Sequence, residues 1–188
     1  MLEHHEQDFI GLDLAGHDLR QRRYEDCRFE RCDLSRADLR QVHFVRCAFK
    51  DCDLSMAKLM GASLQEVSFH GCRMLGFDLG ACKPMLFAAQ FIDCRLDHAM
   101  ISGPSMKGQR FDRCSMRGAD LSGADLREAV FNACDMQDAV IEGCDLRGAD
   151  LSTAHSFRID PEASKLSGTR FSVDGALSLL GKYGVVVE

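Results

Sequence analysis

Apolar side chains recur at every fifth residue along most of this chain. They run from Phe9 to Leu79 and, after a break that adds two residues, from Leu86 to Leu151, and all 29 of these centres are apolar. An α-helix repeats every 3.6 residues and a strand every two, so neither can keep such a column on one buried side. The period therefore predicts a chain that coils and turns a corner in each unit.

A second column stands two residues before each centre, and it is Ala or Cys at 19 of 29 places. Nine of the ten cysteines fall in it, with Cys82 in the break as the exception: Cys27, Cys32, Cys47, Cys52, Cys72, Cys94, Cys114, Cys134 and Cys144. Cysteine that alternates with alanine at equivalent positions acts as a small buried hydrophobe. Thiols on parallel rungs do not converge on one point as metal ligands do. We therefore expect reduced cysteines and no metal site.

Phenylalanines mark a longer repeat of 20 residues. Phe9, Phe29, Phe49 and Phe69 are 20 apart, as are Phe91, Phe111 and Phe131, whereas Phe69 and Phe91 are 22 apart. Four units thus make one square coil, and stacked coils share a continuous core. With a strand spacing of ~4.8 Å, about seven coils give a rod of roughly 34 Å.

The two ends depart from the pattern. Gln7, His17 and Arg22 are polar in the small column, so we expect an open or distorted first coil that acts as a cap. The register stops after Leu151, and "VDGALSLLGKYGVVVE" predicts a short helix capped by Asp174 and ended by Gly184, followed by a valine strand. So short a helix needs packing partners, at the end of the rod or on a second subunit. The apolar residues that need them are Leu177, Leu179, Leu180, Tyr183, Val185, Val186 and Val187.

The break, within residues 80–85, pushes Lys83, Pro84 and Met85 away from the wall of the coil. It is either a tolerated surface insertion or a binding loop, because loops on rigid scaffolds often carry function.

Known catalytic and cofactor motifs are missing from the sequence, which has no phosphate-binding loop, no dinucleotide glycine motif and no HExxH. We expect no enzyme activity and no cofactor. The net charge of −6 argues against direct binding of nucleic acid and permits a partner with a basic surface. No apolar run approaches the roughly 20 residues of a membrane span, and the N-terminus has no signal-like stretch, so we expect a cytoplasmic protein that does not enter a membrane.

Units such as "ADLSG" at 119–123, "CDLRG" at 144–148 and "ADLST" at 149–153 resemble pentapeptide repeats. The resemblance implies an all-β solenoid, a right-handed quadrilateral β-helix of about seven coils over residues 1–151. Residues 152–188 would form a C-terminal capping and dimerisation segment with a short helix.

A closer resemblance concerns two segments. "CDLSMAKLMGASLQEVSFHGCRMLGFDL" is similar to the middle of Qnr quinolone-resistance proteins, and "GKYGVVVE" to the end of the microcin B17 immunity protein. With the MfpA and albicidin-resistance proteins, these form a group that binds DNA gyrase or topoisomerase IV as DNA mimics, protects the enzyme from inhibitors and forms homodimers through the C-terminal segments. The alternative is a structural or adaptor solenoid with an unknown protein partner.

Acids are concentrated toward the C-terminal end, since residues 112–150 hold nine acids and four bases, a net −5. The resemblance implies that outward acids near the dimer centre face the basic surface of the topoisomerase, while residues 83–85 reach a neighbouring surface. The acids chosen are Asp120, Asp125, Asp135, Asp145 and Asp150.

Overall fold

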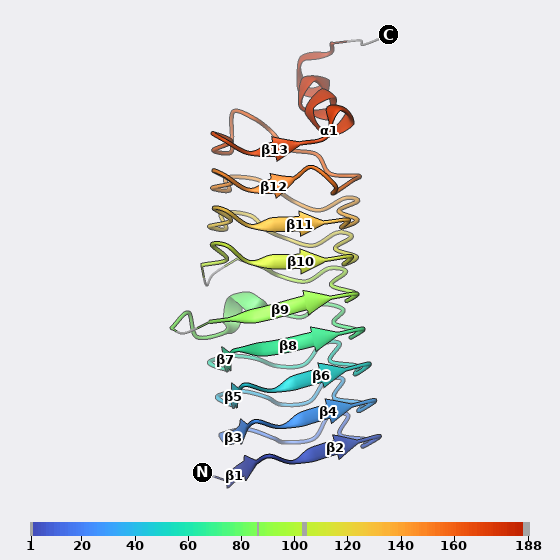
Figure 1. Ribbon diagram of the computed structural model, residues 1–188, viewed down its shortest axis with the longest axis vertical. Coiled ribbons are helices and arrows are strands. Elements are labelled where there is room, and N and C mark those ends of the chain that lie inside the picture. Colours follow the sequence, from blue (N-terminus) through green and yellow to red (C-terminus); the bar gives the residue numbers. More distant parts are fainter. Residues whose placement is uncertain (1, 86, 103–104, 186–188) are drawn as a thin grey trace.

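The computed structural model describes residues 2–85, 87–102 and 105–185. They form a rod of stacked coils that runs from β1 (Leu2–His5) at one end to α1 (Val173–Ser178) at the other (Figure 1). The predicted solenoid is confirmed: the strands are parallel and the rod has about eight turns.

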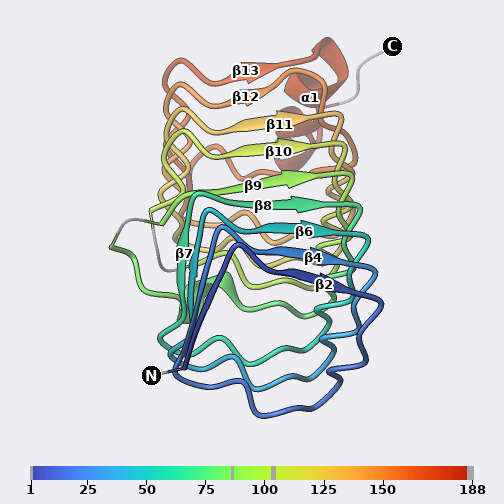
Figure 2. The same cartoon turned by 60° about the horizontal axis from the view of Figure 1, so that its bottom comes forward.

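Two ladders of short parallel strands build two of the walls, and Figure 2 shows the strands of the longer ladder stacked in order along the rod. The nine-stranded ladder consists of β2 (Asp8–Ile10), β4 (Arg28–Glu30), β6 (Ala48–Lys50), β8 (Val67–His70), β9 (Ala89–Ile92), β10 (Arg110–Asp112), β11 (Val130–Asn132), β12 (Asp150–Leu151) and β13 (Arg170–Phe171). The four-stranded ladder consists of β1 (Leu2–His5), β3 (Arg22–Glu25), β5 (His43–Val45) and β7 (Ser63–Gln65). Isolated bridges join successive coils on the other two walls.

The phenylalanine column keeps its register through the break. Phe49 pairs with Phe69, and Phe69 pairs with Phe91, so the two added residues do not change the wall. Neighbouring rings stack with centroids 5.0 Å apart for the first pair and 5.3 Å for the second. This aromatic column forms one side of a core that extends along the rod.

All ten cysteines are free and buried, and this includes Cys82. The amide of Lys83 donates to the carbonyl of Ala62, as the amide of Ser63 donates to that of Val42. Cys82 therefore continues the small column above Val42 and Ala62, and it is no exception to the pattern. The extra residues lie after Cys82, and Phe87 packs against the core once the insertion is over.

The first coil is regular, so the expectation of an open or distorted coil is wrong. β1 pairs with β3 along its whole length, and β2 pairs with β4. Gln7 and His17 are nevertheless exposed, because no further coil covers this end of the rod. The guanidinium of Arg22 donates to the carbonyl of Asp18 at 3.2 Å instead of entering the core.

The coils continue past Leu151, where the sequence pattern predicted that they stop. Asp150 and Leu151 in β12 pair with Arg170 and Phe171 in β13, and Asp145 bridges to Lys165. This additional coil is hidden in the sequence because polar residues take apolar places: Ser156 stands at a centre and Ser164 in the small column. The buried Phe157 lies one residue after the expected centre.

A helical segment closes the C-terminal end of the rod (Figure 1). α1 (Val173–Ser178) continues into the 3₁₀ helix η2 (Leu179–Tyr183), and Gly184 ends it at φ 65° as predicted. The N-cap is Ser172 and not Asp174: its hydroxyl accepts the amide hydrogen of Gly175, and Asp174 lies in the first turn. Residues of the predicted valine strand, Val186 and Val187, lie outside the described residues. None of the helices in the described part of the chain combines the length and apolar character that crossing a membrane requires.

Candidate protein-binding surface

Outward side chains five residues apart lie on successive walls of a four-unit coil, whereas those one coil apart share a wall. Asp125 and Asp145 are bridge partners on one wall. Asp120 stands between Met100 and Val140, Asp135 between Ser115 and His155, and Asp150 between Val130 and Arg170. The five acids chosen from the sequence are therefore spread over all four walls, and only Asp125 and Asp145 come together.

Arginines compensate four of these five acids. Arg127 and Arg147 each reach the carboxylate two residues earlier, at 2.7 Å to Asp125 and 2.7 Å to Asp145. Arg117 lies 2.6 Å from Asp135, and Arg170 lies 3.6 Å from Asp150. The hydrogen bond from Arg147 holds the pKa of Asp145 below its ordinary value, so the acid stays ionised but its field is largely cancelled.

One wall carries acids without lysine or arginine, and we call it the base-free wall; His98 lies at the same corner as Asp138. Its central outward column runs Asp78, Met100, Asp120 and Val140, each bridged to the next, with Asp138 and Glu142 at its corners. Between Lys58 and Arg158, no described outward position of this wall holds Lys or Arg.

Asp120 is exposed, and hydrogen bonding from Ser122 keeps its pKa below the ordinary value. Asp78 is half-buried and caps the 3₁₀ helix η1 (Leu79–Ala81), since its carboxylate accepts the amide hydrogen of Ala81 at 3.1 Å. Gly80 lies against the backbone of the next coil, so closely that a Cβ there would clash with the carbonyl oxygen of Ser102, at 2.1 Å. Gly80, Ser102 and Ser122 flank the central column, so no large side chain at these positions covers the exposed Asp120.

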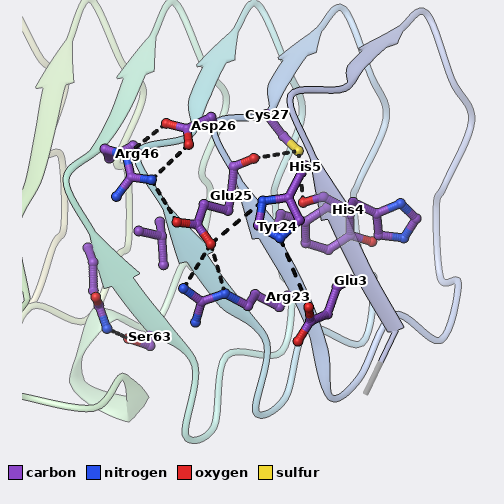
Figure 3. A network of polar contacts seen from close by, with 12 residues as sticks. Glu3, His4, His5, Arg23, Tyr24, Glu25, Asp26, Cys27, Arg46 and Ser63 are labelled. Carbon is purple, nitrogen blue, oxygen red and sulfur yellow. Dashed lines mark hydrogen bonds and ion pairs between the residues drawn. The ribbon is translucent and has the colours of Figure 1, made fainter.

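The four-stranded ladder shows the opposite arrangement of charge (Figure 3). Glu25 accepts hydrogen bonds from Arg46 at 2.7 Å and from Arg23 at 3.0 Å, and His5 lies 3.7 Å away. The guanidinium of Arg46, and after it that of Arg23, holds the pKa of Glu25 below its ordinary value. Arg46 also bonds Asp26, so the charges on this wall compensate one another.

The insertion before β9 projects from the rod (Figure 1). Lys83, Pro84 and Met85 are exposed, and Met85 most of all at 77%. Burial and then the charge of Lys83 lower the pKa of His43, which lies on the four-stranded ladder. The amide of Lys83 donates to the carbonyl of Ala62 just as that of Ser63 in β7 donates to Val42, so the insertion stands on the wall of that ladder and not on the base-free wall.

The apolar residues predicted for dimerisation divide into two sets. Leu179 packs against the core and holds the helical segment on the last coil. Leu177, Leu180, Tyr183 and Val185 are exposed together with Val173, whereas Val186 and Val187 lie outside the described residues. The segment is fixed on its polar side, where Lys182 contacts Asp160 at 2.7 Å and Glu162 at 2.8 Å.

A hollow of about 310 Å³ opens at one corner of the rod. Charged residues dominate its lining, which includes Arg31, Asp33, Asp51, Asp53 and Arg73. Pockets for small molecules are mostly apolar with a few polar groups, so this hollow does not have the chemistry of one.

Comparisons with known proteins agree with the coil pattern. A model of the pentapeptide repeat region matches residues 22–84, and a model of eight pentapeptide repeats matches residues 89–127 and 114–152. A search of curated proteins gives no match.

Solved structures share the fold. One is a trypsin-treated variant of QnrB1, a plasmid-mediated fluoroquinolone resistance protein. It is 18% identical at a TM-score of 0.66, covering 98% of this chain and 99% of that one. Another is HetL from the cyanobacterium Nostoc sp. strain PCC 7120, involved in the regulation of heterocyst differentiation. It is 19% identical at a TM-score of 0.53, covering 91% of this chain and 85% of that one. At such identities the likeness concerns the fold alone.

Proposed function

The chain belongs to the pentapeptide repeat family, and on that premise we propose that it is a DNA-mimicking protein that binds a type II topoisomerase. The enzyme is DNA gyrase or topoisomerase IV, and the solenoid occupies the basic surface on which the enzyme holds DNA. It thereby protects the enzyme from inhibitors and confers antibiotic or toxin resistance. The chain binds and does not catalyse, and its action on a DNA enzyme assigns it to the cytoplasm.

The observation that carries this proposal is the charge density of the base-free wall. Asp78, Asp120, Asp138 and Glu142 lie within three coil spacings, which is roughly 14 Å. That amounts to one negative charge in about 3.6 Å, close to the ~3.4 Å per charge along one strand of DNA. The chain as a whole has a net charge of only −6, so this local wall supports mimicry better than the average charge does.

Dimerisation would enlarge the acidic surface that faces the enzyme. The exposed apolar residues of α1 and η2 lie at the C-terminal end of the rod, a few coils from the base-free wall. A homodimer formed through them brings two such walls toward its centre. A longer acidic surface then faces the basic groove of the enzyme, and electrostatic attraction raises the association rate.

The insertion at Lys83, Pro84 and Met85 has a separate task in this proposal. It stands on the wall of the four-stranded ladder and not on the base-free wall, so it reaches a neighbouring surface of the enzyme while the base-free wall occupies the DNA site. Contact there helps to displace drug or DNA.

A supercoiling assay with purified gyrase tests the proposal, run with and without a fluoroquinolone. We expect added protein to restore supercoiling in the presence of the drug. The alternative, an adaptor solenoid for another protein, draws on the likeness to HetL and predicts that both curves stay unchanged.

A further inference from the structure

The central column of the base-free wall alternates between acidic and apolar residues. Asp78, Met100, Asp120 and Val140 follow one another on four successive coils, joined by parallel bridges. The two apolar members are not covered by the wall, since Met100 is 43% exposed and Val140 is 41% exposed. Negative charge alone does not explain why exposed apolar side chains occupy every second coil of this column.

The spacing of this column restricts the shape of a partner. Successive coils are ~4.8 Å apart, so the two carboxylates are ~9.6 Å apart with an apolar residue midway. Along an α-helix, residues i and i+7 are ~10.5 Å apart on one side, with i+3 and i+4 between them. A β-strand along the rod would repeat its side chains every ~6.7 Å and lose the register after one coil.

We propose that the base-free wall binds one basic amphipathic α-helix of the partner protein, lying along the rod axis. Lys or Arg at positions i and i+7 pairs with Asp78 and Asp120, and apolar residues halfway between and beyond them contact Met100 and Val140. This inference rests on the proposed function in one respect, because it uses the same wall as the contact surface.

The surroundings of the column fit such a helix. Gly80, Ser102 and Ser122 stand beside the central residues, and none of them rises far enough to hold a cylinder of ~10 Å diameter away from the column. Asp138 and Glu142 border the column at its C-terminal end. They offer further acceptors to cationic side chains on the flanks of the helix.

A direct test uses two designed peptides and no topoisomerase. The first is a helical peptide of about 18 residues with lysine at every seventh position and leucine midway between lysines. The second has the same composition with lysines and leucines on opposite sides of the helix. We expect fluorescence anisotropy to give the first peptide an affinity for the full-length protein roughly tenfold higher than that of the second. Equal affinities would overturn the inference.

Two double variants distinguish the apolar contacts of the column from its electrostatic attraction. Met100→Asp with Val140→Asp adds two negative charges, yet we expect it to weaken binding of the first peptide, because the apolar contacts are lost. Met100→Ser with Val140→Ser should weaken it as well without a change of charge. Leu75→Asp, at a 46% exposed residue of another wall, is the control and should leave the affinity unchanged. Tighter binding by the aspartate pair would contradict the helix and favour simple electrostatic attraction.

The two proposals fail in different ways. If both peptides bind equally while loss of the wall acids still abolishes gyrase binding, the helix inference is wrong and the proposed function stands. If the first peptide binds selectively while gyrase is unaffected by the protein, the wall recognises helices of another partner and the proposed function is wrong.

Discussion

Met100 and Asp120 are bridge partners on successive coils, so an exposed thioether and a carboxylate lie side by side in the base-free wall. The two residues belong to the same column only because the chain needs four units to return to a wall. Bridge partners on one wall are 20 residues apart, or 22 across the break.

A substitution at Gly80 tests how closely the backbones of neighbouring coils approach each other. A Cβ at this position would lie 2.1 Å from the carbonyl oxygen of Ser102, which belongs to the backbone and cannot rotate away. We expect Gly80→Ala to lower the free energy of unfolding by about 2 kcal/mol or more, as other overpacked sites do.

The matched control for that substitution is Gly181→Ala, where nothing lies within 4 Å of the added carbon. It should change stability by less than ~0.5 kcal/mol. Urea denaturation measures both variants, and similar losses in the two would contradict the close approach at Gly80.

The buried thiols predict a loss of stability at alkaline pH. Burial raises the pKa of Cys47 to about 11 and that of Cys82 to about 12, whereas an unfolded thiol titrates near ~8.5. Since the folded-state pKa is the higher one, the stabilisation is complete below pH ~8.5 and is lost as the pH rises toward the folded values. Each such thiol contributes a slope of at most ~1.4 kcal/mol per pH unit.

Urea unfolding at pH 8 and pH 10 checks this slope. Cys47→Ala should reduce the slope by the contribution of one thiol. The native protein should not react with a thiol reagent at pH 8. A slope that is the same in wild type and variant would show that this thiol is not the source.

Exposed leucines of the C-terminal segment predict the dimer interface. Leu177 and Leu180 are each 37% exposed, and a charge at either would be buried without a partner in a dimer formed there. We expect Leu177→Asp with Leu180→Asp to give a folded monomer in light scattering. Leu75→Asp is the control and should remain dimeric, whereas a double variant that stays dimeric would place the interface elsewhere.

The insertion and the wall should be separable by mutation. Replacing residues 83–85 by glycine and serine removes only exposed side chains, so the fold should survive. We expect gyrase affinity to change by no more than about threefold, while protection from a fluoroquinolone is largely lost in the supercoiling assay. Full protection by this variant would remove the insertion from the mechanism.

The sequence predicted the fold well because each coil repeats the same physical requirement. An apolar residue at every fifth position and a small one two before it were enough to place the core, and the 22-residue step from Phe69 to Phe91 was enough to keep the wall. The last coil escaped prediction because Ser156 and Ser164 stand where apolar or small residues were expected.

The candidate site was harder to predict, because the sequence was searched for acids close together along the chain. Asp120, Asp125 and Asp135 are near in sequence but lie on different walls, and Arg127 and Arg117 compensate the last two. A comparison of outward residues that are 20 or 22 positions apart in the sequence would have identified the column from Asp78 to Val140. The ion pairs depend on side-chain geometry that the repeat does not specify.

The most direct test of DNA mimicry by the base-free wall compares two triple variants that remove equal charge. Asp120→Asn with Asp138→Asn and Glu142→Gln removes three of the four acids of the base-free wall, whereas Asp125→Asn with Asp135→Asn and Asp145→Asn removes three acids that arginines already compensate. We predict that the first variant binds gyrase at least roughly tenfold more weakly at low salt and with a smaller salt dependence, and that the second binds nearly as wild type does. Equal affinities of the two variants, or a larger loss in the second, would contradict the claim that the base-free wall takes the place of DNA.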